Sequence, residues 1–126
     1  MTHSVLVVDD EKMTRDLLRM MLQPAGFEIS EAENGLEALQ QIAKQRPDIV
    51  ILDVMMPEMD GLTACAEIRR NPQTANLPVI MLSAKTHGTA VAEGLAAGAD
   101  LYLTKPIARQ KLIEAIHALI NNKEPA

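Results

Sequence analysis

Four short apolar runs in this sequence are followed by side chains that could take part in chemistry. Taken singly, each such side chain has an ordinary explanation, since aspartate and serine often cap helices or form turns and a lysine is usually solvated. Their shared position behind apolar runs is hard to attribute to chance and favours one common site. The pairs are Val5–Val8 with Asp9 and Asp10, Ile49–Leu52 with Asp53, Val79–Leu82 with Ser83, and Leu101–Leu103 with Lys105.

The chemistry of such a site follows from its charges. The clustered carboxylates of Asp9, Asp10 and Asp53 would repel one another and raise at least one pKa unless a cation lay among them. Lys105 cannot neutralise all three, whereas Mg²⁺ binds carboxylates together with water and phosphate oxygens. The three carboxylates, the lysine and Mg²⁺ sum to zero charge, which suits a dianionic phosphoryl group. A carboxylate can attack phosphorus to give an acyl phosphate, with the metal, the lysine and the Ser83 hydroxyl stabilising the charge.

The elements that must position these residues can be read from the hydrophobic pattern. Continuous β-branched runs are typical of strands buried on both faces, and apolar residues at intervals of three and four predict amphipathic helices. Phe27–Ser30 is less hydrophobic and predicts an edge strand, and the expected helices are Thr14–Leu22, Leu36–Ala43, Leu62–Ile68, Thr89–Ala97 and Leu112–Ile120.

Strands that alternate with helices predict an α/β fold, here a (βα)5 doubly wound sheet of five parallel strands with helices on both faces. In such a sheet, ligands bind at the carboxyl ends of the strands. The polar residues behind the apolar runs lie at those ends, so the fold would bring them together.

Composition narrows the class of protein further. The chain has 126 residues, a single domain's length, with 12 Lys+Arg, 17 Asp+Glu and a net charge of −5. An acidic chain without a basic run argues against direct nucleic-acid binding, and the single cysteine, Cys65, excludes an internal disulfide and a cysteine-based zinc site. Without a membrane-length apolar stretch or a signal peptide, we expect no membrane contact and a cytoplasmic location.

Four motifs carry a resemblance to a known family. In sequence order they read VDDE at Val8–Glu11, LDVMMPEMDG at Leu52–Gly61, LSA at Leu82–Ala84 and GADLYLTKP at Gly98–Pro106. With these motifs the chain resembles the receiver domain of bacterial two-component response regulators, of the single-domain kind found in chemotaxis. The similarity runs from about Ser4 to Ile120, and a strand order of 2-1-3-4-5, as in flavodoxin-like proteins, is implied.

The resemblance implies a role for each residue of the acidic cluster. Asp53 would accept a phosphoryl group from a sensor histidine kinase or a histidine phosphotransfer protein. Asp10, Asp53 and the backbone carbonyl of Met55 would bind Mg²⁺ directly, and Asp9 would act through a bound water. The domain would then be a signalling switch rather than an enzyme, although it would assist its own phosphorylation and dephosphorylation.

The same resemblance implies a switch beside the cluster. Lys105 would contact the phosphoryl oxygens, and the bond between Lys105 and Pro106 would be cis. Ser83 would move toward the phosphoryl group, and Tyr102 would rotate inward behind it. A downstream protein would dock on the surface formed by the fourth helix, fifth strand and fifth helix.

Three features depart from the pattern or need their own interpretation. Ile107 stands where many relatives have phenylalanine, which makes the docking face less aromatic. Met55 and Lys85 flank the phosphoryl position, and we hypothesise that they shield an acyl phosphate from water. Met20, like Met21 and Met81, is interpreted as a packing residue rather than as partner surface.

The same residues argue against two other functions and leave two domain arrangements open. An aspartate-nucleophile phosphatase needs a second acid two residues after its nucleophile, where this chain has Met55. A flavodoxin-like electron carrier needs a Ser/Thr/Gly-rich loop in place of Asp9–Lys12. We expect residues 1–122 to form the receiver domain and 123–126 a short polar tail. The chain would act alone, or would be the excised receiver of a regulator with a DNA-binding or second-messenger output domain.

Overall fold

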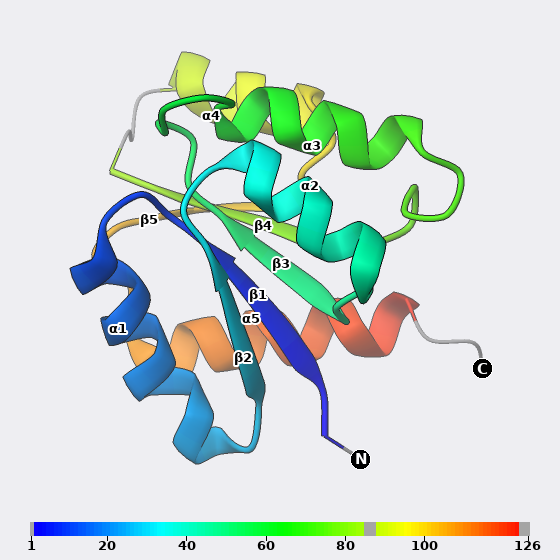
Figure 1. Ribbon diagram of the computed structural model, residues 1–126. Helices are drawn as coiled ribbons and strands as arrows, with labels where there is room; N and C mark the ends of the chain where they lie inside the picture. Colours follow the sequence, from blue (N-terminus) through cyan, green and yellow to red (C-terminus); the bar gives the residue numbers. More distant parts are fainter. Residues whose placement is uncertain (1, 85–87, 124–126) are drawn as a thin grey trace.

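Five strands and five α-helices alternate along the chain in a computed structural model that describes residues 2–84 and 88–123 (Figure 1). A short 3-10 turn, η1, follows the first helix. The elements are β1 Ser4–Val8, α1 Lys12–Leu22, η1 Gln23–Ala25, β2 Glu28–Ala32, α2 Gly35–Lys44, β3 Ile49–Leu52, α3 Gly61–Arg70, β4 Val79–Ser83, α4 Gly88–Ala96, β5 Leu101–Thr104 and α5 Arg109–Lys123.

The strands form one parallel sheet in the order β2-β1-β3-β4-β5. This confirms the predicted doubly wound α/β fold and its strand order. Val8, the last residue of β1, pairs with Ala32 on one side and Leu52 on the other, and Ser83 pairs with Thr104. The register therefore brings the carboxyl ends of neighbouring strands to one edge of the sheet.

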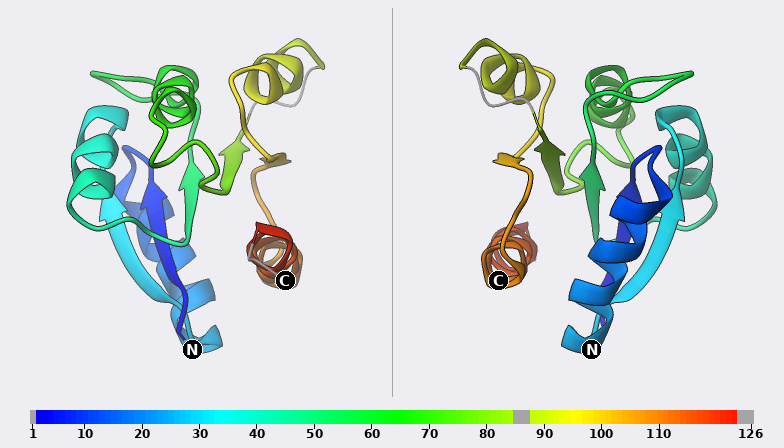
Figure 2. Two further views of the ribbon diagram at one scale, coloured as in Figure 1. Left: turned by 90° about the vertical axis from the view of Figure 1, so that its right-hand side faces the viewer. Right: turned by 90° about the vertical axis from the view of Figure 1, so that its left-hand side faces the viewer.

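The helices cover both faces of the sheet, with α1 and α5 on one face and α2, α3 and α4 on the other (Figures 1 and 2). Alternate residues of a strand point to opposite faces. Val5 and Val7 of β1 accordingly pack with Leu18 of α1 and Ile116 of α5, whereas Leu6 joins the cluster under α2 and α3. Each fully buried large aliphatic side chain contributes about 1.5–3 kcal/mol.

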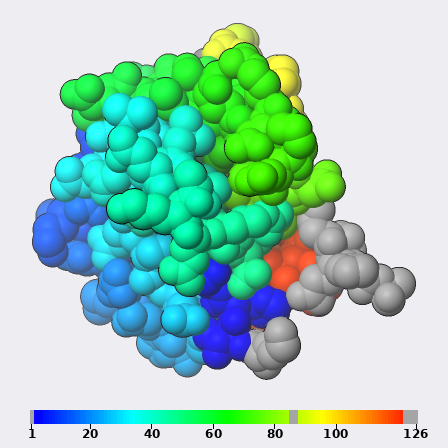
Figure 3. Space-filling model, turned by 45° about the vertical axis from the view of Figure 1, so that its right-hand side comes forward, coloured from blue at the N-terminus to red at the C-terminus, as the bar shows by residue number. Residues whose placement is uncertain are grey.

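Helix α3 lies directly beside α2, as the space-filling view shows (Figure 3). The N–H of Gly35, at the start of α2, donates to the carbonyl of Met59 in the loop before α3 (3.0 Å). A Cβ at Gly35 would lie 2.7 Å from that carbonyl oxygen, so the approach requires glycine. This contact fixes the loop between β3 and α3 against α2.

Helix α1 contradicts one interpretation made from the sequence. Met20 was expected to pack in the core, but its side chain is 72% exposed. The buried face of α1 carries Arg15, Leu18 and Leu22 instead. Apolar residues occur on two faces of this helix, so their spacing alone could not select the face that meets the sheet.

Candidate functional site

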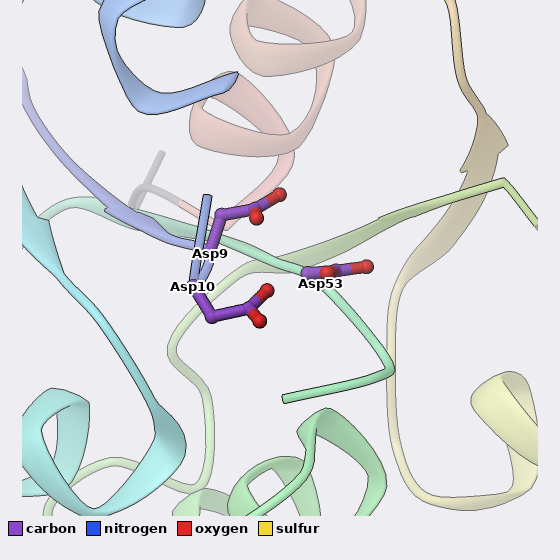
Figure 4. Close-up of side chains that lie close together, drawn as sticks. All are labelled: Asp9, Asp10 and Asp53. Carbon is purple, nitrogen blue, oxygen red and sulfur yellow. The ribbon is translucent and has the colours of Figure 1, made fainter. Parts of the chain in front are cut away.

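The three predicted carboxylates come together at the carboxyl ends of β1 and β3. Asp9 and Asp10 follow β1, Asp53 follows β3, and these strands are neighbours in the sheet. One carboxylate oxygen from each residue lies within 4.8 Å of the other two. All three side chains extend to the same side of the strand ends (Figure 4). Asp9 and Asp53 are buried and Asp10 is exposed, so the cluster opens to solvent on the side of Asp10.

Lys105 links the end of β5 to this cluster. Its Nζ donates to Asp9 Oδ2 at 2.7 Å and lies 3.7 Å from Asp53 Oδ1. Burial alone would lower the pKa of Lys105, but the hydrogen bond to Asp9 and the charge of Asp53 raise it above its ordinary value. The lysine is therefore positively charged at neutral pH. The bond between Lys105 and Pro106 is cis, as the family resemblance implied.

Asp9 is held by the protein through both carboxylate oxygens. Oδ1 accepts the backbone N–H of Glu11 at 2.9 Å, while Oδ2 accepts the ammonium of Lys105. Asp9 is 2% exposed. Its carboxylate is thus an anchor for the lysine and for the start of α1, with less freedom than Asp10 to turn toward a ligand.

The surroundings of Asp53 raise the pKa of its carboxyl group. Burial raises the pKa of Asp53 to about 6, with a further upward contribution from the charge of Asp9 and a smaller one from Asp10. The charge of Lys105 and the backbone N–H of Val54, which donates to Oδ1 at 2.9 Å, act in the opposite direction. Repulsion that one lysine does not cancel is the electrostatic setting in which a divalent cation binds favourably.

The proposed switch residues lie on neighbouring strands β4 and β5. Ser83 is the buried last residue of β4, and its carbonyl accepts the N–H of Lys105 at 2.8 Å. Tyr102 of β5 is half-buried and packs against the core cluster under α2 and α3. A Cβ at Gly94 of α4 would lie 2.6 Å from the Tyr102 ring. The ring therefore rests against the backbone of α4, in a space that Gly94 leaves open.

The remaining residues singled out from the sequence lie around the cluster. Met55 is in the loop after Asp53, and its side chain is 59% exposed. With Met56, Asp60 and residues of α4 it lines a groove of about 250 Å³. Ile107 is half-buried and packs against the core on the side of α1 and α5. Lys85, the other residue of the shielding hypothesis, lies outside the described residues.

Gly61 has a positioning role that the sequence interpretation did not recognise. Its N–H donates to the carbonyl of Val54 at 2.8 Å, and a Cβ at this position would collide with the carbonyl oxygen of Asp53. Helix α3 therefore begins in direct contact with the backbone that carries Asp53. The only signal in the sequence was a glycine at the start of a predicted helix, in the motif that also contains Asp53.

Residues 5–117 match the family described as the response regulator receiver domain. The chain belongs to this family. Phosphorylation-dependent signalling in two-component systems is the general function of its members. This confirms the family that the motifs at the strand ends indicated.

Individual relatives show the same similarity. The response regulator MprA of Mycobacterium leprae is 40% identical over 121 residues, which cover 96% of this chain and 52% of the relative. This receiver domain thus spans about half the length of the curated relatives it matches.

Two solved structures share the fold closely. The receiver domain of a signal transduction histidine kinase from Syntrophus aciditrophicus is 31% identical, with a TM-score of 0.92 over 98% of this chain and 94% of that one. The Vibrio cholerae chemotaxis protein CheY4 is 34% identical, with a TM-score of 0.88 over 94% of this chain and 99% of that one.

Among the described helices of this receiver domain, none is long and apolar enough to cross a membrane.

Proposed function

We propose that Asp53 is the phosphoryl acceptor of this receiver domain and that the phosphoryl group comes from a histidine of a sensor kinase or phosphotransfer protein. The observation that carries the proposal is the convergence of three carboxylates and Lys105 on one strand edge, with the pKa of Asp53 raised to about 6. A catalyst for phosphoryl transfer needs positioning and positive charge more than covalent chemistry. This cluster offers both.

In the transfer step, a carboxylate oxygen of Asp53 attacks phosphorus as the bond from phosphorus to the histidine nitrogen breaks. The electron pair of that bond returns to the imidazole ring, which takes up a proton. The N–H of Val54 fixes the rotation of the Asp53 carboxylate by donating to Oδ1. Lys105, 3.7 Å from the same oxygen, is placed to neutralise charge on the phosphoryl oxygens.

Mg²⁺ fits the donor set, because it binds oxygen ligands and is typically held by one or two carboxylates together with water and phosphate oxygens. Asp10, Asp53 and the backbone carbonyl of Met55 would hold it, and it would supply positive charge to the phosphoryl oxygens. Asp9 would contribute through a bound water, since both of its oxygens already accept protein donors. With these protein ligands, an Mg²⁺ ion would also bind water and could accept a phosphoryl oxygen.

The signal would leave the domain through the surface of α4, β5 and α5. Addition of the phosphoryl group places new negative charge near the carboxyl end of β4, toward which the Ser83 hydroxyl would turn. Tyr102 lies on the neighbouring strand β5 with its ring against α4, so a movement of Ser83 would change the packing of that ring. A downstream protein would recognise the rearranged surface. The balance between the two states must shift by several kcal/mol for a complete switch.

We further propose that this domain is a signalling receiver, not an enzyme with a separate substrate, and that it promotes its own phosphorylation and dephosphorylation at Asp53. Residues 1–122 would form the working unit. This assignment fits a domain that acts alone, and it equally fits the receiver domain of a longer regulator. A net charge of −5 disfavours direct binding to nucleic acid, and the cytoplasmic location stays a prediction.

The test is incubation with a small acyl phosphate donor and Mg²⁺, followed by the intact mass of the protein. We expect one added phosphoryl group in the wild type, and none in Asp53→Asn or in the presence of a chelator. Asp60→Asn is the matched control, because Asp60 is an exposed helix cap outside the cluster and asparagine also caps helices. An Asp53→Asn protein that gains the phosphoryl group as readily as the wild type would overturn the proposal.

A further inference from the structure

Helix α1 turns a charged residue toward the interior. Arg15 is 7% exposed and shares the buried face of the helix with Leu18 and Leu22. Burying a guanidinium is costly unless its N–H groups find partners. The partners that Arg15 has are therefore informative about why it is there.

Arg15 joins the loop of the acidic cluster to the edge strand β2. Its Nη1 donates to the backbone carbonyl of Asp9 at 2.7 Å, in a buried hydrogen bond. Its Nε donates to Glu31 Oε1 at 2.9 Å, and its Nη2 lies 3.8 Å from Glu33 Oε1. The peptide groups on both sides of Asp9 are therefore held, because the N–H of Asp9 donates to the carbonyl of Ala32, also in β2, at 3.1 Å.

The carbonyl that Arg15 holds belongs to the peptide group between Asp9 and Asp10. Rotation of this peptide would swing the Asp10 side chain away from Asp53. Asp10 is exposed, so packing does little to fix its direction and its backbone must do so. The carboxylate with the greatest freedom to meet a cation is therefore aimed through a hydrogen bond made by Arg15.

Glu31 is a suitable support for this arrangement. Partial burial alone would raise the pKa of Glu31, but its hydrogen bonds to Arg19 and Arg15 lower the pKa below its ordinary value. Glu31 therefore stays negatively charged at neutral pH and keeps the guanidinium of Arg15 paired. The rigid planar guanidinium of Arg15 bridges the Glu31 carboxylate and the Asp9 carbonyl with two of its nitrogens. The single nitrogen of a lysine ammonium could not hold both groups at this spacing.

We propose that Arg15 is a positioning residue for the cation site: it clamps the Asp9–Asp10 peptide to β2 and thereby sets the Mg²⁺ affinity of the domain. The inference rests on the proposed function, because it presupposes that the acidic cluster binds Mg²⁺. Arg15 bonds the backbone carbonyl of Asp9 and the carboxylate of Glu31, and not the three carboxylates of the acidic cluster. Removing it should weaken cation binding in the unphosphorylated protein, before any phosphoryl transfer takes place.

Arg19 provides a matched control on the same helix. Its Nε and Nη2 donate to Glu31 Oε2 at 2.9 and 2.6 Å, so it shares the Glu31 carboxylate with Arg15. Within the described part of the chain, the side-chain hydrogen bonds of Arg19 go to Glu31 and not to Asp9. Arg19→Met therefore removes one positive charge and an ion pair to Glu31 without releasing the loop, whereas Arg15→Met also releases the Asp9 carbonyl.

The experiment measures Mg²⁺ affinity of the full chain by calorimetric titration, and independently by the rise in unfolding free energy that Mg²⁺ produces over a chelator. Partners behind metal ligands typically contribute 10- to 100-fold in affinity. For Arg15→Met we expect affinity about tenfold weaker, which reduces the Mg²⁺-induced stabilisation at saturating concentration by about 1.4 kcal/mol. For Arg19→Met we expect a change of less than about twofold.

Arg15→Lys restores the charge and one hydrogen bond, so its Mg²⁺ affinity should fall between those of the wild type and Arg15→Met. Equal Mg²⁺ affinity in Arg15→Met and the wild type would overturn the inference. An equal loss in Arg15→Met and Arg19→Met would also overturn it, because an effect common to both arginines could not come from the Asp9 carbonyl, which Arg15 holds and Arg19 does not. Should Arg15→Met fail to fold, Arg15→Lys against Arg19→Lys decides by the same criteria. A wild type that binds no Mg²⁺ would instead refute the proposed function.

Discussion

Replacement of Asp53 by asparagine is expected to stabilise the folded domain at neutral pH in the absence of divalent cations. The charged carboxylate of Asp53 is 10% exposed and lies among Asp9, Asp10 and the single cation Lys105. Asparagine has the same shape and keeps an oxygen that can accept the N–H of Val54. The substitution therefore removes the buried charge with little change in packing.

The magnitude follows from the pKa of Asp53, which rises from 3.8 to about 6 in the folded protein. Each unit of pKa corresponds to about 1.36 kcal/mol, so ionising Asp53 in the folded state costs roughly 3 kcal/mol at pH values well above 6. Because the folded-state pKa lies above the unfolded value, the folded protein binds this proton more tightly. The cost is absent below about pH 4, grows as the pH rises to 6, and is complete above it.

The assay is urea unfolding of wild type and Asp53→Asn in chelator, at pH 7.5 and at pH 4. We expect the variant to be more stable by roughly 2–3 kcal/mol at pH 7.5, and the difference to shrink toward zero at pH 4. Added Mg²⁺ should narrow the gap at pH 7.5, because a bound cation offsets the repulsion in the wild type alone. Asp60→Asn, the exposed control, should change stability by less than about 0.5 kcal/mol at either pH.

Two results would refute this reasoning. If Asp53→Asn were no more stable than the wild type at pH 7.5 in chelator, the carboxylate of Asp53 would not be under the electrostatic stress inferred from its surroundings. If the variant were stabilised equally at pH 4 and pH 7.5, the gain would come from packing or from the unfolded state, and not from the buried charge.

Three further substitutions test the surroundings of the site. Gly61→Ala should lower the unfolding free energy by more than 1 kcal/mol and slow phosphorylation, because the alanine Cβ would collide with the Asp53 carbonyl. Wild-type stability together with a wild-type phosphorylation rate would contradict this. Gly94→Ala should push Tyr102 outward, and since Tyr102 is the chain's only tyrosine and no tryptophan is present, its fluorescence should become easier to quench with iodide. Unchanged quenching would show that the ring does not need the space at Gly94. Met55→Asn should shorten the lifetime of the acyl phosphate, and an unaltered dephosphorylation rate would end the shielding hypothesis.

The sequence was sufficient for the fold because its periodic signals were clear. The central strands are almost uninterrupted apolar runs, and the alternation of strands with helices leaves few possible topologies. Polar residues at the ends of such strands must meet once the sheet is parallel. The convergence of Asp9, Asp10 and Asp53 could therefore be predicted without any coordinates.

What the sequence could not reveal depends on contacts between distant residues. Arg15 occupies a buried position in α1, yet its partner Glu31 lies 16 residues away on another element. A search for apolar stripes places charged residues on the exposed face of a helix, so it does not identify a buried arginine. The error at Met20 has the same origin, because the phase of an amphipathic helix is decided by its packing partner. The space at Gly94 likewise acquires meaning only when β5 brings Tyr102 against α4.

Phosphorylation of this domain is expected to form an acyl phosphate on Asp53. Borohydride reduces an acyl phosphate to an alcohol, which converts a phosphorylated aspartate into homoserine, and peptide mass mapping then locates the altered residue. After phosphorylation with Mg²⁺, we expect homoserine at position 53 alone, and none when the donor or Mg²⁺ is omitted. Homoserine at position 9, 10 or 60 with Asp53 intact, or a phosphoryl group that borohydride leaves in place, would contradict it.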